Sequence, residues 1–258
     1  MADATARGRF LWHELMTTDT KAASDFYQQV VGWKPKTWDQ DPSYTLLETD
    51  GRQMAGLMPL PQQARDMGAG PFWMSYIGTP DIEATVKQTV ELGGQVHKSI
   101  TAIPQYGRFA VLQDPQGASF AAFSPTRVPE GDAKPGLGDF SWHELITTDA
   151  DAAFAFYQKL FGWQKTDAMD MGPGMGVYQM FGRDTQSMGG MFKKPAEMPF
   201  PPMWLPYSLI PDSKNAADTI GKAGGKVLNG PMEVPGGDFI VQGLDPQGAM
   251  FAVHSRKQ

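Results

Sequence analysis

Two glutamates in the sequence, Glu14 and Glu144, stand in identical Trp-His-Glu-Leu segments. The surrounding residues alternate as β-strands do, so Trp12, Glu14 and Met16 should share one face. A carboxylate among indoles and thioethers is costly to ionise unless it is paired. Such a group suits a general base, or an acceptor for a polar group of a ligand. The alternative is a structural carboxylate that bonds Arg, Tyr, Trp or backbone N–H groups and fixes the strand order.

The two segments belong to a long internal repeat. Phe10–Trp33 and Phe140–Trp163 are identical at 15 of 24 positions, at an offset of 130 residues. The sequence Asp-Pro-Gln-Gly-Ala also occurs twice, at 114–118 and at 245–249. The chain is therefore a tandem duplication.

Each half repeats one order of elements twice. Alternating residues predict a strand before Asp19, which offers an N-cap to a helix ending near Gly32, and three short strands follow. A second unit begins with a strand at 72–78. We expect Thr79 to cap its helix, with Pro80 at the first helical position. The unit is strand–helix–strand–strand–strand, and it occurs four times in the chain.

The length and composition agree with two domains. The chain has 258 residues, and a stretch rich in Pro, Gly and charged residues separates the two halves. Such a stretch is typical of an exposed linker. We predict one domain at 7–125, a linker at 126–138 and a second domain at 139–256.

The repeated motifs indicate a family. The Asp-x-x-x-Ala-x-x-Phe-Tyr openings at Asp19 and Asp149, each ending in Gly-Trp, and the two Asp-Pro-Gln-Gly-Ala turns resemble the vicinal oxygen chelate superfamily. That superfamily includes glyoxalase I, bleomycin resistance proteins and extradiol dioxygenases, and the doublet is similar to tandem bacterial glyoxalase-like proteins. The resemblance implies an α+β fold of four βαβββ units. They would form two eight-stranded, cup-shaped mixed sheets with the helices outside.

The resemblance also implies where a metal would lie. The family usually holds a divalent cation inside each cup through His, Glu or Gln side chains. The matching positions in this sequence are Trp12, Met74 and Ala121 in the first half, and Trp142, Leu205 and Ala252 in the second. Hard cations require oxygen or nitrogen donors, which these side chains do not provide. We therefore expect no metal and no other cofactor.

In this fold the Trp12 face would line the cup and the His13 face would look toward the helices. We therefore expect His13 and His143 to be core histidines. The side chains expected to line the cups are mostly aromatic or thioether groups, which suit flat or apolar small molecules, although they could equally fill the cups as core. They are Trp12, Tyr44, Met58, Met74 and Phe123 in the first half, and Trp142, Tyr178, Phe192, Leu205 and His254 in the second. His254 has no histidine counterpart in the first half.

The amino-acid composition excludes some classes of binding partner. The net charge is −6 and no cluster of Lys and Arg occurs, which argues against nucleic acid. No apolar run is long enough to span a membrane, and the absence of cysteine fits a reducing cytoplasm. We expect a small-molecule ligand and a cytoplasmic location, and the sequence leaves homo-oligomerisation open.

Three functions are compatible with these features. The favoured one is a metal-independent protein that binds a small apolar or aromatic molecule in its cups. The second is a metal-free enzyme that uses Glu14 or Glu144 as acid or base. The third is a metal-dependent lyase or dioxygenase of the family's usual kind, which the residues at the ligand positions contradict.

Overall fold

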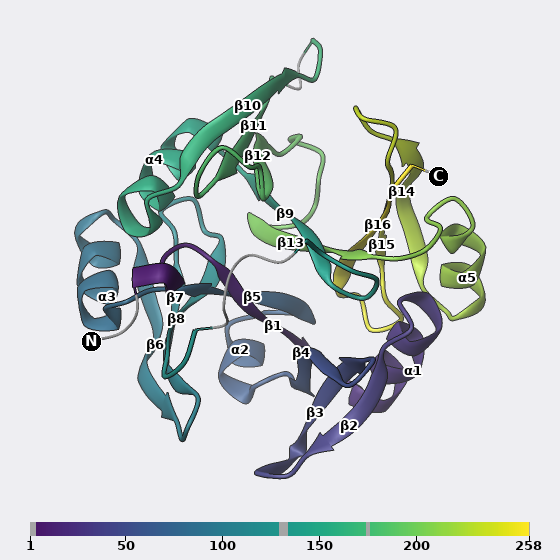
Figure 1. The fold of residues 1–258 in the computed structure, drawn as a ribbon, viewed down its shortest axis with the longest axis horizontal. Helices are drawn as coiled ribbons and strands as arrows, with labels where there is room; N and C mark the ends of the chain where they lie inside the picture. Colours follow the sequence, from purple (N-terminus) through teal and green to yellow (C-terminus); the bar gives the residue numbers. More distant parts are fainter. Residues whose placement is uncertain (1–3, 129–133, 174–175, 258) are drawn as a thin grey trace. The chain divides into compact units, whose positions relative to one another are not determined.

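A computed structural model describes residues 4–128, 134–173 and 176–257 (Figure 1). Part of the predicted linker, 129–133, lies outside the described residues. In the described ranges, no helix has the length and apolar character needed to cross a membrane.

The two halves form the same order of elements after a short 3-10 helix at Ala4–Ala6. The first half contains β1 (Phe10–Thr17), α1 (Thr20–Val30), β2 (Lys34–Trp38), β3 (Asp41–Thr49), β4 (Arg52–Pro59), α2 (Gln62–Asp66), β5 (Phe72–Gly78), α3 (Ile82–Glu91), β6 (Gln95–Ile103), β7 (Gly107–Gln113) and β8 (Ser119–Pro125). The second half contains β9 (Phe140–Thr147), α4 (Ala150–Phe161), β10 (Gln164–Asp170), β11 (Val177–Gly182), β12 (Gly189–Lys193), β13 (Met203–Leu209), α5 (Ala216–Lys222), β14 (Lys226–Glu233), β15 (Phe239–Leu244) and β16 (Met250–Ser255).

Each half makes one eight-stranded mixed sheet. The strand order is β2-β3-β4-β1-β5-β8-β7-β6 in the first sheet and β10-β11-β12-β9-β13-β16-β15-β14 in the second. The first and last strands of every βαβββ unit pair in parallel, as β1 does with β4 and β5 with β8. The α+β fold with four βαβββ units is therefore confirmed.

Aspartates begin three of the helices. Asp19 caps α1 as predicted, and Asp149 caps α4 in the same way, since each carboxylate accepts a hydrogen bond from a backbone N–H in the first turn. The start predicted for α3 was wrong, since Pro80 lies before the cap and not at the first helical position. Asp81, not Thr79, accepts the bond from the Ala84 N–H at 2.9 Å. The Thr79 hydroxyl is instead bonded to the Thr85 hydroxyl at 2.7 Å, inside the protein.

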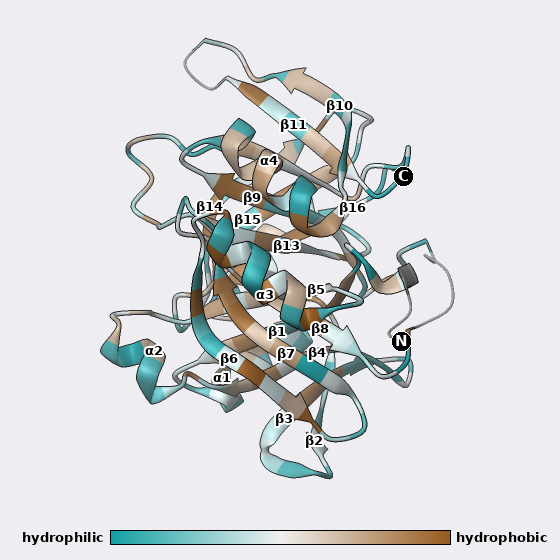
Figure 2. Ribbon diagram, turned by 90° about the vertical axis from the view of Figure 1, so that its left-hand side faces the viewer, coloured by the Kyte–Doolittle hydropathy of each residue, from teal (hydrophilic) through white to brown (hydrophobic). Residues whose placement is uncertain are grey.

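The short helix α2 has no counterpart in the sequence-based expectations. It spans five residues, none of which is buried, and Figure 2 colours it largely hydrophilic. A helix without an apolar stripe leaves no periodic signal in the sequence.

The chain forms two compact units, and each unit combines parts of both halves. One unit consists of Met1–Leu11, Ser75–Asp132 and Trp142–Trp204, and the other of Trp12–Met74, Ala133–Ser141 and Leu205–Gln258. Each unit thus pairs one βαβββ block of the first half with one block of the second. Accordingly, α3 contacts α4 in one unit, and α1 lies beside α5 in the other (Figure 1).

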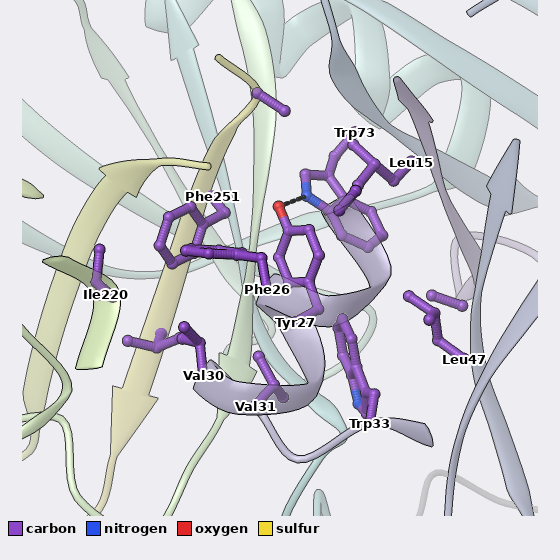
Figure 3. Packing of buried hydrophobic residues seen from close by; sticks show 14 of the residues in the cluster. Leu15, Phe26, Tyr27, Val30, Val31, Trp33, Leu47, Trp73, Ile220 and Phe251 are labelled. Atoms are coloured by element: carbon purple, nitrogen blue, oxygen red, sulfur yellow. Dashed lines mark hydrogen bonds between the residues drawn. The ribbon is translucent and has the colours of Figure 1, made fainter. Parts of the chain in front are cut away.

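Aromatic side chains fill the core of each unit. We call the compact unit that contains α3 and α4 the first unit and the one that contains α1 and α5 the second unit. In the second unit, Phe26 of α1 packs edge-on against Phe251 of β16, with ring centroids 5.2 Å apart (Figure 3). Trp33 and Trp73 lie on the other side of Tyr27 in the same cluster. Burial of one such side chain stabilises a fold by about 1.5–3 kcal/mol.

One polar chain runs through each core and joins the repeated motifs of opposite halves. In the second unit the Trp73 indole donates to the Tyr27 hydroxyl at 3.0 Å, and that hydroxyl donates to the Asp245 carboxylate at 3.2 Å. Burial raises the pKa of Asp245 despite its bonds to Tyr27 and to backbone N–H groups. The Phe-Tyr motif of one half is therefore anchored to the Asp-Pro-Gln-Gly-Ala turn of the other.

The first compact unit contains the same series of hydrogen bonds. The Trp204 indole donates to the Tyr157 hydroxyl at 3.0 Å, and that hydroxyl donates to Asp114 at 3.0 Å. Burial is also the main reason why the pKa of Asp114 is raised. Both copies of the duplicated motif thus hold the same contact.

Candidate functional site

The strand β1 has two faces with different roles. Leu15 is fully buried in a hydrophobic core, so alternation directs Trp12 and Glu14 to the opposite face of the sheet. Glu14 nevertheless has only 6% of its surface exposed. The Glu14 carboxylate is therefore buried although it lies on the face of β1 opposite the hydrophobic core.

Glu14 ends a chain of hydrogen bonds that begins at Trp12. The Trp12 indole Nε1 lies 3.0 Å from the Tyr44 hydroxyl, which lies 2.7 Å from Glu14 Oε1. An indole N–H only donates, so the Tyr44 oxygen accepts from Trp12 and its hydrogen points to Glu14. Trp12 and Glu14 of β1 are therefore joined by Tyr44, which lies about thirty residues further along the chain, into one hydrogen-bonded group.

The second half forms the same chain in the other compact unit. Trp142 Nε1 lies 2.7 Å from the Tyr178 hydroxyl, which lies 3.0 Å from Glu144 Oε1. The Phe192 ring stacks on Tyr178, with centroids 5.9 Å apart. We call each set of three residues a Trp–Tyr–Glu chain. Its occurrence in both halves shows that the arrangement is part of the repeat.

A glycine beside each glutamate makes room for the tyrosine. Gly56 of β4 pairs with Glu14 of β1, and Gly190 of β12 pairs with Glu144 of β9. A Cβ atom on Gly56 would lie 1.7 Å from the Tyr44 hydroxyl oxygen, and one on Gly190 would lie 2.0 Å from a Tyr178 ring carbon. The tyrosine rings therefore reach the carboxylates only because these two positions have no side chain.

Replacing Gly56 with Ala should expel Tyr44 from its place and cost about 1–3 kcal/mol of unfolding free energy. Urea unfolding of Gly56→Ala measures this loss. Gly70→Ala is the matched control, because no atom lies within 4 Å of a Cβ there, and we expect a change below about 0.5 kcal/mol. Equal stability of the two variants would contradict the packing described here.

The surroundings of Tyr44 and Tyr178 in the two Trp–Tyr–Glu chains keep both tyrosines protonated. Burial raises the pKa of Tyr44 far above its usual range, and the neighbouring Glu14 charge raises it further. The same two causes, with Glu144 as the neighbour, raise the pKa of Tyr178. Each tyrosine is therefore a phenol that donates its hydrogen to a carboxylate.

The two histidines of the Trp-His-Glu-Leu segments lie on the core side. His143 stacks on Phe10 with ring centroids 3.6 Å apart, and its Nδ1 lies 3.2 Å from the Met188 carbonyl oxygen. Burial lowers the pKa of His143 from 6.5 to about 3. His13 is also buried and lies against Phe140, with centroids 3.8 Å apart. Both occupy the core positions predicted for them.

The other predicted lining residues fall into separate groups. Met58 lies opposite Met16 in the parallel pair of β4 and β1. Phe123 belongs to an aromatic group with Tyr76 and Phe109, whose centroids lie within 6.3 Å of Tyr76. The two remaining positions, Met74 and Leu205, are buried.

His254 has two polar partners that the sequence did not indicate. Its Nδ1 lies 2.8 Å from the Ser141 hydroxyl, and its Nε2 lies 2.9 Å from Asp238 Oδ2. The repeat itself contains a usable signal. At the matching positions of the first half stand Leu11 and Gly107, so both partners depart from the repeat just as His254 does.

The positions at which the fold would place a metal do not fit a hard cation. The two indoles there donate to tyrosines, and the other side chains are apolar or thioether groups: Trp12, Met74 and Ala121, with Trp142, Leu205 and Ala252. Across the described part of the chain, no three His, Asp or Glu side chains gather as metal ligands. Divalent cations of this class require oxygen or nitrogen donors.

The sequence is similar to curated bacterial proteins over almost its full length. It is 32% identical over 250 residues to CFP32 of Mycobacterium tuberculosis, whose name assigns it provisionally as a glyoxylase; the match covers 94% of this chain and 92% of that protein. It is 29% identical over 262 residues to the anthracycline biosynthesis protein DauV of a Streptomyces species, covering 96% and 93%.

Solved structures share the fold at low sequence identity. The Mn(II)-bound glyoxalase from Novosphingobium aromaticivorans has a TM-score of 0.65 at 14% identity, covering 98% of this chain and 83% of that one. The 2,2',3-trihydroxybiphenyl 1,2-dioxygenase from Sphingomonas wittichii has a TM-score of 0.69 at 12% identity, covering 98% and 91%.

A family model matches each half separately, at residues 9–121 and 140–253. The two matches cover all but the last few residues of the four βαβββ units and contain both Trp–Tyr–Glu chains. With the fold and the relatives, they lead to one conclusion. The chain belongs to the Glyoxalase/Bleomycin resistance protein/Dioxygenase superfamily.

Proposed function

We propose that this chain is a metal-independent member of the superfamily that binds a small aromatic molecule at its Trp–Tyr–Glu chains. The observation that supports this is the buried carboxylate of Glu14, held by Tyr44 on the face of the sheet opposite the core. Burying a carboxylate is costly unless it is hydrogen-bonded, and here the Tyr44 hydroxyl supplies such a bond. The same cost is met twice, once in each half.

The chemistry of the group suits a flat ligand with a hydroxyl. Trp12 and Trp142 are only half-buried, and indole rings are suited to stacking on flat ligands. A carboxylate accepts a hydrogen bond from a ligand hydroxyl, and such charge-assisted bonds are the stronger ones. The name of DauV, which refers to anthracycline biosynthesis, supports a polycyclic phenol as the first class to test.

The test uses 1,8-dihydroxyanthraquinone as the probe, with tryptophan fluorescence and calorimetry as readouts. We expect saturable binding, and a loss of about tenfold to hundredfold in affinity in Glu14→Gln combined with Glu144→Gln. Glu48→Gln is the control, because Glu48 pairs with Lys36 on β2 at 3.4 Å. It should bind as the unmodified protein does.

Two results would overturn the proposal. The first is stoichiometric metal in protein purified without chelators, measured by elemental analysis. The second is probe affinity that stays the same in the double variant, provided that circular dichroism shows a folded protein.

The second candidate is a metal-free enzyme that uses Glu14 or Glu144 as acid or base. The observation in its favour is the short tyrosine–glutamate distance of 2.7 Å, which suits transfer of a proton along the chain. Slow conversion of a bound phenol or ketone, lost in Glu14→Gln while binding persists, would favour this function over simple binding.

A further inference from the structure

We propose that Ser141, His254 and Asp238 form a nucleophilic site for acyl transfer, separate from the Trp–Tyr–Glu chains. All three residues belong to one compact unit. The Ser141 hydroxyl lies 2.8 Å from one ring nitrogen of His254, and Asp238 lies 2.9 Å from the other. A hydroxyl, an imidazole and a carboxylate in this order make up the general arrangement of an activated serine.

The bonds fix which nitrogen of His254 acts as the base. The Asp238 carboxylate only accepts, so His254 Nε2 bears the hydrogen and Nδ1 presents its lone pair to Ser141. The Ser141 hydroxyl has one other acceptor, the Tyr207 carbonyl oxygen at 3.3 Å, which is the longer contact. In this tautomer His254 Nδ1 is the acceptor at the shorter contact of the serine hydroxyl.

Asp238 is suited to hold that tautomer. Burial opposes its ionisation, but the Lys257 backbone N–H and the His254 side chain hold the pKa of Asp238 below its usual value. The carboxylate is therefore charged at neutral pH. The Asp238 side chain is 34% exposed and that of His254 16%, and Ser141 is half-buried.

Comparison between the halves shows that the fold does not require these polar groups. The counterpart of His254 is Phe123, which packs with Tyr76 in an aromatic group. The counterparts of Ser141 and Asp238 are Leu11 and Gly107. The first half builds the same strands with none of the three groups, so a purely structural role does not explain them.

The reaction that these groups support is hydrolysis of a small activated ester. Ser141 Oγ attacks the carbonyl carbon, and its proton passes to His254 Nδ1 as the new C–O bond forms. The bond to the leaving alcohol then breaks, and the alcohol takes the proton from Nδ1. Water then attacks the acyl carbon and gives a proton to His254 Nδ1, the bond between that carbon and Ser141 Oγ breaks, and Oγ takes the proton back from Nδ1. Ester and water thus give acid and alcohol, and the serine hydroxyl is restored.

A fluorophosphonate is the probe, because it modifies activated serines much faster than ordinary hydroxyl groups. We expect it to label Ser141, identified by peptide mass spectrometry, and 4-nitrophenyl acetate to be hydrolysed. His254→Phe installs the residue of the first half. It should slow both reactions by about 100-fold or more, because general-base assistance is lost. Ser187→Ala is the control, since Ser187 is bonded to Thr166 and not to a histidine.

The role of Asp238 has its own readout. Imidazole ¹⁵N chemical shifts should show Nε2 protonated and Nδ1 unprotonated in His254, and Asp238→Asn should shift that preference while slowing the labelling. No labelling of Ser141, an unchanged labelling rate in folded His254→Phe, or the opposite tautomer in the unmodified protein would each overturn the proposal.

Discussion

Acidification from pH 6.5 toward pH 3 is expected to remove about 5 kcal/mol of folding free energy through His143 alone. Burial lowers the pKa of this imidazole from 6.5 to about 3, and the hydrogen bond to the Met188 carbonyl opposes that effect. In the unfolded chain His143 becomes protonated near its ordinary pKa of 6.5, whereas in the folded protein it stays unprotonated until the pH approaches 3. The stabilising contribution is therefore complete above pH 6.5 and is lost as the pH falls toward 3.

Urea unfolding at pH 7, 6, 5 and 4 measures this effect when the protein is compared with His143→Gln. At pH 7 the variant should be less stable, because it loses the stack on Phe10. Below pH 6.5 the difference should shrink by about 1.4 kcal/mol per pH unit, which corresponds to one proton. His97→Gln, at a half-buried position of β6, is the control. A difference between protein and His143→Gln that is constant over this range would refute the assignment.

Replacing Tyr157 with Phe is expected to destabilise the protein by about 2–4 kcal/mol. The lost hydroxyl accepts from the Trp204 indole and donates to Asp114, and all three side chains are buried. Both partners would lose this contact away from water. Tyr27→Phe should behave alike, because Trp73 and Asp245 form the same chain in the other compact unit. The two losses should add.

The cost should also depend on pH. The pKa of Asp114 is raised by burial, so the folded state keeps its proton to higher pH than the unfolded chain does. Stability from this group therefore falls as the pH rises from 3.8 through the folded pKa. Without the hydrogen bond from Tyr157, the charged form of the Asp114 carboxylate is less stable in the folded protein. The loss of unfolding free energy in Tyr157→Phe should therefore be larger at pH 7 than at pH 4. Exposed Tyr106 supplies the control, as Tyr106→Phe should change stability by less than about 0.5 kcal/mol. A deficit as small as that control's, or one independent of pH, would be incompatible with this account.

Local sequence patterns were sufficient for most of the fold. Alternation and aspartate caps located β1 and α1, and the repeat then transferred the same elements to the second half. The error at Thr79 was one of choice between two capping side chains only two residues apart. Local sequence does not decide between them, because both Thr and Asp are good caps.

The candidate site was predicted residue by residue but not as a connected group. Alternation placed Trp12 and Glu14 on one face, yet the bond from Tyr44 to Glu14 depends on the space above Gly56. That space follows from the pairing of β1 with β4, which no short segment encodes. Ser141 and His254 are 113 residues apart, so only the fold could bring them together.

The composition of the compact units was not predictable for a different reason. All four βαβββ blocks have similar apolar helices and strands, so hydrophobic pattern alone does not select which block buries which. The specific contact between Tyr27 and Asp245 is made by residues that have identical counterparts in the other half. The sequence is compatible with either pairing, and the domain limits at 125 and 139 stay a prediction.

Because each compact unit takes one block from either half, neither half can complete a core by itself. Two separate half-length chains would have to associate, and their stability would fall on dilution. Covalent fusion turns that association into a unimolecular step, with an effective concentration on the order of millimolar for short connections. It also fixes a one-to-one stoichiometry of unlike partners. Differences between the halves, such as Phe123 in one and His254 in the other, can therefore accumulate, because a half cannot pair with an identical copy of itself in place of the other half.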